Sequence, residues 1–166
     1  MRQKSVYFQS LYRQYKKKSL RAEGRHELYE RMVKNAEHFA EWAIVYQLGD
    51  NKYRYDALEN MKNTVYDEQR SSDVQMNILE LFEIVTDETE QENILKKYLS
   101  RFNGKDDLLF VMAMSSISSE VYWEAENKAI SLDYYKGLGT LHNAVEKKDK
   151  KLKSRLSNSP FMKYLD

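Results

Sequence analysis

The sequence contains no cysteine, a single proline and only five glycines in 166 residues. Without cysteine, disulfides, thiolate zinc sites and cysteine nucleophiles are excluded. A β-rich chain of this length would need many tight turns, which glycine and proline usually form. The scarcity of both residues therefore predicts a helical protein.

Long apolar runs are also missing. The longest strongly apolar stretch, Leu108 to Met114, is far too short to cross a bilayer. The first ten residues, MRQKSVYFQS, lack the apolar run of a signal peptide. We expect no membrane span and a cytoplasmic location, and a secreted mature domain fits the same composition.

Apolar residues recur at spacings of three or four, which is typical of helices with one buried face. Gly49 stands where a glycine cap would end a helix. The fold class is predicted to be all-α, with six to seven helices in an antiparallel bundle or in stacked helical hairpins. We expect one domain over 1–156 and a loosely packed tail over 157–166. The expected helices span residues 3–22, 26–48, 52–69, 76–85, 88–102, 106–135 and 141–156.

The expected helix over 106–135 is the longest. Its first half is apolar on most sides, which is typical of a central helix. The helix over 88–102 follows Thr86 and Asp87, either of which can cap a helix.

Charge is distributed unevenly although the net charge is only +1. Residues 1–36 carry +7, residues 37–135 carry −11 and residues 136–166 carry +5. Clustered basic residues form solvated faces in many proteins, and they also form contact surfaces for acidic partners. The candidate contact residues for a partner protein or a polyanion are Arg13, Lys16, Lys17, Lys18, Arg21, Arg25, Lys147, Lys148, Lys150 and Lys151.

Aromatic residues are interleaved with the first basic cluster, at Tyr7, Phe8, Tyr12 and Tyr15. Surfaces that combine aromatic and basic residues can bind single-stranded nucleic acid. The sequence pI of about 7.8 is lower than expected for a dedicated nucleic-acid-binding domain. Nucleic acid is therefore the first alternative to a protein partner.

Motifs for catalysis, cofactors and metals are not evident. The chain has three histidines, and Glu23-x-x-His26 is the one occurrence of the orientation found in di-iron bundles. It has neither a Gly-x-Ser-x-Gly elbow nor the Gly-Lys-Ser/Thr of a P-loop. We expect no catalytic, cofactor-binding or metal-binding residues.

Arg31 and His38 lie seven positions apart, which brings them to nearly the same face of an ideal helix. An Arg followed closely by a His resembles the motif of HEPN-type helical ribonucleases. The resemblance implies that the pair would act on an RNA phosphodiester across a dimer. A HEPN-like ribonuclease is the second alternative.

The string Tyr134-Tyr135-Lys136-Gly137-Leu138-Gly139-Thr140 resembles the YKGLG segment of type II topoisomerases. Those enzymes also use an acidic Asp-x-Asp cluster to bind metal, and this sequence has no Asp-x-Asp. The similarity covers seven residues, and we do not predict a topoisomerase from it.

The sequence therefore predicts a non-catalytic helical module, with an interaction, scaffold or sensor role, that presents a charged face to another protein. It leaves open the identity of that partner and the oligomeric state.

Overall fold

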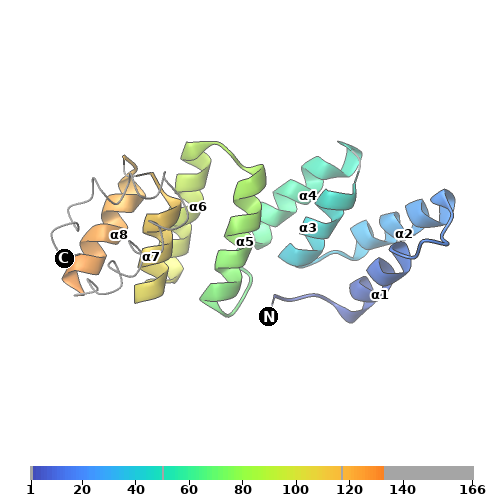
Figure 1. The fold of residues 1–166 in the computed structure, drawn as a ribbon, viewed down its shortest axis with the longest axis horizontal. Helices are drawn as coiled ribbons and strands as arrows, with labels where there is room; N and C mark the ends of the chain where they lie inside the picture. Colours follow the sequence, from blue (N-terminus) through green and yellow to red (C-terminus); the bar gives the residue numbers. More distant parts are fainter. Residues whose placement is uncertain (1, 50, 117, 133–166) are drawn as a thin grey trace. The chain divides into compact units, whose positions relative to one another are not determined.

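The computed structural model describes residues 2–49, 51–116 and 118–132. Within these residues it contains eight α-helices and no strand, which confirms the all-α class (Figure 1). None of the eight is long and apolar enough to span a membrane. The expected helix over 141–156 and the expected tail lie outside the described residues. The helices are α1 Val6–Tyr15, α2 Ala22–Asn35, α3 Phe39–Leu48, α4 Asn51–Thr64, α5 Ser71–Ile84, α6 Glu88–Arg101, α7 Lys105–Met114 and α8 Glu120–Ser131.

The chain divides into two compact units, Met1–Ile84 and Val85–Asp166, which we call the N-terminal and C-terminal units. In the N-terminal unit α1 packs on α2, α3 packs on α4, and α3 also contacts α2 and α5. One core cluster draws on the first four helices. Its buried members are Phe8, Leu11, Leu28, Tyr29, Met32, Val45 and Ala57.

The predicted continuous helix over 26–48 is wrong, because α2 ends at Asn35 and α3 begins at Phe39. The side chain of Glu41 explains the break. Its Oε1 accepts hydrogen bonds from the backbone N–H groups of Glu37 and His38, both at 3.0 Å. These amides would otherwise need partners within a continuing helix, so the carboxylate stabilises the interruption.

The other oxygen of Glu41 binds the N-terminal segment. Oε2 accepts from both the backbone N–H and the hydroxyl of Ser5, each at 2.9 Å. Ser5 in turn caps α1, since its Oγ accepts from the N–H of Phe8 at 3.1 Å. Residues 2–5 then run back toward α5, where Arg2 pairs with Glu80 at 2.6 Å (Figure 1).

In the C-terminal unit α6, α7 and α8 pack on one another. The predicted continuous helix over 106–135 is also wrong, because α7 ends at Met114 and α8 begins at Glu120. Serine hydroxyls bond at both ends of the break. Ser115 donates its hydroxyl to the Val111 carbonyl at 2.6 Å, beside the bond from its own N–H, and the Ser119 hydroxyl accepts from the Tyr122 N–H at 3.3 Å. Short polar side chains compete with helical hydrogen bonds in this way.

The predicted cap before α6 is confirmed at Asp87, whose carboxylate accepts from the Glu90 N–H at 2.9 Å. The start of α7 is held similarly, since Asp107 accepts from the Gly104 N–H at 3.0 Å. Asp107 also accepts the hydroxyl hydrogen of buried Tyr98. This bond joins α6 to the first turn of α7.

Gly49 follows α3 as predicted, but it is not a left-handed glycine cap, since its φ is −77°. Glycine is needed here because there is no room for a Cβ atom. A Cβ at this position would overlap the hydroxyl of Tyr29 and would lie 2.8 Å from the Val45 carbonyl oxygen. That hydroxyl donates to the same carbonyl at 3.1 Å.

We expect Gly49→Ala to lower the free energy of unfolding by about 1–3 kcal/mol, because the methyl group forces Tyr29 away from the Val45 carbonyl. Urea unfolding measures the change. Gly24→Ala is the control, since its Cβ would meet only the flexible side chain of Leu20. Tyr29→Phe removes the obstructing hydroxyl and should shrink the effect of Gly49→Ala. Equal effects in both backgrounds would contradict this explanation.

We expect Glu41→Gln to lower the free energy of unfolding by about 2–4 kcal/mol, because the amide nitrogen cannot accept from N–H donors on one side of the site. Glu37→Gln changes the same charge at an exposed neighbouring position and serves as the control. Equal stabilities of the two variants would show that the carboxylate of Glu41 does not maintain the break between α2 and α3.

Candidate partner-binding surface

Residues 16–21 join α1 to α2 and carry much of the first basic cluster. Five of its six cationic residues are exposed, while Arg25, on α2, is half-buried. All six N-terminal candidates lie within residues 13–25, on α1, the connection and the start of α2. We call them the basic surface: Arg13, Lys16, Lys17, Lys18, Arg21 and Arg25.

None of these six cations lies within ion-pairing distance of a carboxylate in the part of the chain that the structure describes. Other basic residues do have such partners, for example Lys62 with Glu59 at 3.5 Å and Lys96 with Glu120 at 3.1 Å. Arg13 lies in the last turn of α1, where a cation interacts favourably with the helix dipole. The dipole does not account for the cations beyond that turn.

Arg25 holds the connection against α2. Its guanidinium donates to the carbonyl of Lys17 at 3.3 Å and lies over the ring of Tyr15, 5.6 Å from the centroid. The Leu20 N–H also donates to the Lys17 carbonyl, at 3.2 Å. The connection is therefore an ordered turn that displays its lysine side chains to solvent.

Of the four aromatic residues near the basic surface, Tyr7 is exposed and the other three are buried or half-buried. Phe8 is fully buried, and Tyr12 and Tyr15 are half-buried against the core cluster. Lys16 lies 4.4 Å from the ring centroid of Tyr12, so a cation of the chain already occupies one face of that ring. Base stacking needs open ring faces. Of these four rings, Tyr7 is therefore the one that is largely open to solvent.

An open pocket of about 350 Å³ adjoins the basic surface. Apolar side chains form much of its wall, and Arg25 and His26 contribute the polar groups. The Nε of Arg25 is covered and has no hydrogen-bond partner among the described residues. The lining residues are Tyr15, Leu20, Ala22, Arg25, His26, Tyr29 and Leu48.

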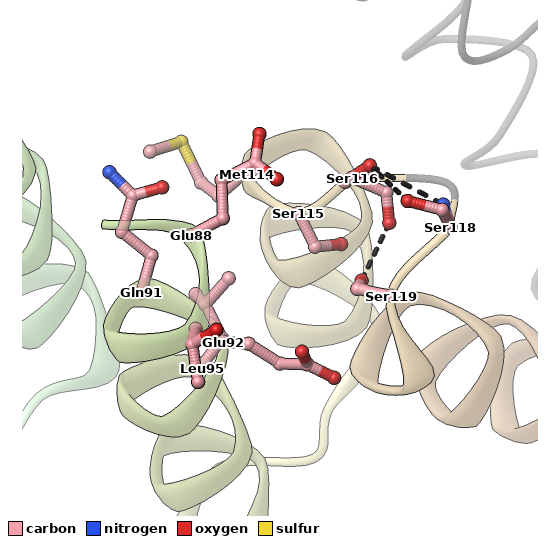
Figure 2. Close-up of a pocket in the computed structure, with 10 residues that line it drawn as sticks. Glu88, Gln91, Glu92, Leu95, Met114, Ser115, Ser116, Ser118 and Ser119 are labelled. Carbon is pink, nitrogen blue, oxygen red and sulfur yellow. Dashed lines mark hydrogen bonds between the residues drawn. The ribbon is translucent and has the colours of Figure 1, made fainter. Parts of the chain in front are cut away.

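A second cavity, of about 170 Å³, lies in the C-terminal unit between α6 and the connection from α7 to α8 (Figure 2). Glu88, Gln91 and Glu92 line one side, and four serines line the other. The Ser119 hydroxyl donates to the Ser116 carbonyl at 2.6 Å and accepts from the Tyr122 N–H as the cap of α8, so it is already engaged. Among the described residues that line this cavity there is no histidine to activate a serine.

Glu92 is tied into the same unit, since it accepts from the Val121 N–H at 3.3 Å and lies 3.8 Å from the amine of Lys96. The hydrogen bond between Lys96 and Glu120 raises the pKa of Lys96. These contacts show that Glu92, on the acidic side of the cavity, helps to hold α6 against the start of α8.

The predicted shared helix face of Arg31 and His38 is wrong. Arg31 is exposed on α2, whereas His38 precedes α3, beyond the break. His26 lies 3.0 Å from Glu30 on the exposed side of α2. No group of three or more potential metal ligands occurs among the described residues.

The remaining candidates cannot be located. Lys147, Lys148, Lys150 and Lys151 lie outside the described residues, as does the Tyr134–Thr140 string. The pocket beside the basic surface was not expected from the sequence. Its one local signal is Leu20, an apolar residue within a strongly basic stretch.

No protein-family model matches the chain, and no curated protein or solved structure is significantly similar to it. Its functional assignment therefore depends on its own residues.

We expect Arg25→Gln to loosen the connection between α1 and α2, because it removes the bond to the Lys17 carbonyl and the contact with Tyr15. Amide hydrogen exchange at Leu20 should accelerate about fivefold or more, as the loss of about 1 kcal/mol predicts. Exchange at Val45, in α3, should be unchanged. Unchanged exchange at Leu20 would mean that Arg25 does not order this turn.

Proposed function

We propose that the N-terminal unit is a protein-interaction module that binds an acidic segment of another protein through the basic surface. The observation that supports this proposal is the absence of carboxylate partners for its six cations among the described residues. Unpaired like charges repel one another at close range. An acidic partner relieves this repulsion when it binds.

Electrostatic complementarity of this kind steers partners together and suppresses association with basic proteins. The individual contacts are exposed and each contributes little, because salt screens them. Several cations on one ordered turn, however, present a localised positive field. The proposed role is therefore recognition by a charged face, without a chemical reaction.

A protein partner is favoured over nucleic acid by the orientation of the aromatic rings. Tyr12 and Tyr15 pack toward the core and are covered by Lys16 and Arg25. They offer little surface for stacked bases. We further propose that α1 with α2 and α3 with α4 act as stacked helical hairpins, an architecture whose surfaces commonly bind peptides.

The test uses the full chain and a short Glu/Asp-rich peptide with a fluorescent label. We expect Lys17→Gln/Lys18→Gln to weaken binding about three- to tenfold, since two surface charge contacts are lost. Arg31→Gln/Lys34→Gln is the matched control. It removes the same charge from exposed residues of α2 outside the basic surface, and it should leave affinity nearly unchanged.

The competing outcomes are distinct. Equal weakening by the two double variants would indicate nonspecific attraction to net charge and would contradict a defined surface. Tighter binding of single-stranded RNA or DNA than of the peptide, with a steep decline as salt rises, would replace the protein partner by a nucleic acid.

A further inference from the structure

The pocket beside the basic surface differs chemically from its surroundings. Residues of the basic surface are mostly exposed and charged, whereas Leu20, Leu48 and Tyr29 contribute an apolar part to the pocket wall beside its polar groups. Leu20 comes from the connection, Tyr29 from α2 and Leu48 from the end of α3. Three segments of the N-terminal unit therefore contribute apolar side chains to this one concavity.

We propose that the acidic segment of the partner carries a large apolar side chain, such as Phe or Leu, which enters this pocket. This inference rests on the proposed function, because the basic surface supplies the attraction that brings the segment to the pocket. The pocket then supplies specificity, since acidic segments without such a side chain gain nothing from it.

The size of the pocket fits one such side chain. A closed apolar cavity of about 150 Å³ is large enough to bind benzene. The open pocket here measures about 350 Å³, which leaves room for a phenyl or isobutyl group and for part of the adjoining backbone. Ala22, an exposed residue with a small side chain, contributes to the lining.

Arg25 connects the apolar and charged parts of the surface. Its guanidinium lines the pocket and is held by the Lys17 carbonyl, while Nε has no hydrogen-bond partner among the described residues. A covered donor without an acceptor costs free energy. A carboxylate next to the apolar side chain would supply an acceptor after a small shift of Arg25. The geometry therefore favours an acidic residue adjacent to the apolar one.

The experiment compares two labelled peptides with the full chain. Both are short and Glu/Asp-rich, and they differ in a central Phe or Ala. We expect the Phe peptide to bind about tenfold more tightly, as burial of a phenyl group predicts. Both affinities should fall as salt rises, because charge contacts are screened. Their ratio should stay constant, because burial of an apolar group is not screened.

Ala22→Trp tests the pocket directly, since a bulky side chain at its edge fills the space. We expect this variant to bind both peptides with the affinity that the unmodified protein shows for the Ala peptide. Asn63→Trp places the same side chain on an exposed position of α4 and should preserve the tenfold ratio.

The outcomes separate the two proposals. If both peptides bind the unmodified protein equally and respond equally to salt, the basic surface remains the binding site and the pocket inference is wrong. If neither binds, the proposed function fails and the inference fails with it. A tenfold ratio that survives in Ala22→Trp would place the Phe elsewhere and would overturn the inference.

Discussion

The N-terminal unit depends on the fully buried carboxylate of Glu41, whose two oxygens serve different segments. One oxygen stabilises the break between α2 and α3, because it accepts hydrogen bonds from the Glu37 and His38 amides. The other fixes Ser5, the residue that caps α1. A buried carboxylate is costly unless it is well hydrogen-bonded, and here four donors compensate it. The start of α1 and the start of α3 are thereby held together.

Two further acidic residues of the N-terminal unit hold the segment before α1. Glu80 pairs with Arg2, and Glu68 accepts from the N–H of Gln3 at 3.2 Å. Together with the contact between Glu41 and Ser5, these bonds fix residues 2–5 in place.

The helical class and the approximate positions of most helices could be predicted from the sequence, because a spacing of three or four apolar residues has a direct structural meaning. The two interruptions could not. Periodicity continues from Leu28 to Tyr46, and the break between them involves Glu41, whose Oε1 accepts from the amides of Glu37 and His38. The burial of Glu41 also involves Ser5, which is 36 positions away and has no local signal in the sequence. The serines between α7 and α8 also accompany a break, here through local hydrogen bonds. They do not predict it, because small polar residues also occur inside helices.

The exposed cations of the basic surface could be predicted, since Lys and Arg are rarely buried and these are close in sequence. The pocket could not, because it needs Leu20 and Leu48 to meet. The orientation of the tyrosines could not be predicted either. The sequence is equally consistent with Tyr12 and Tyr15 as core residues or as solvent-exposed rings. Which role a tyrosine takes is decided by what packs against it.

Tyr29 links the pocket to the end of α3. Its ring lines the pocket, while its hydroxyl is fixed on the Val45 carbonyl in the space that Gly49 leaves empty. The floor of the pocket is therefore already in place before any ligand arrives. A preformed site spares the entropy of ordering its own side chains. Under the proposed function, we expect association to be governed by encounter rather than by a slow opening of the protein.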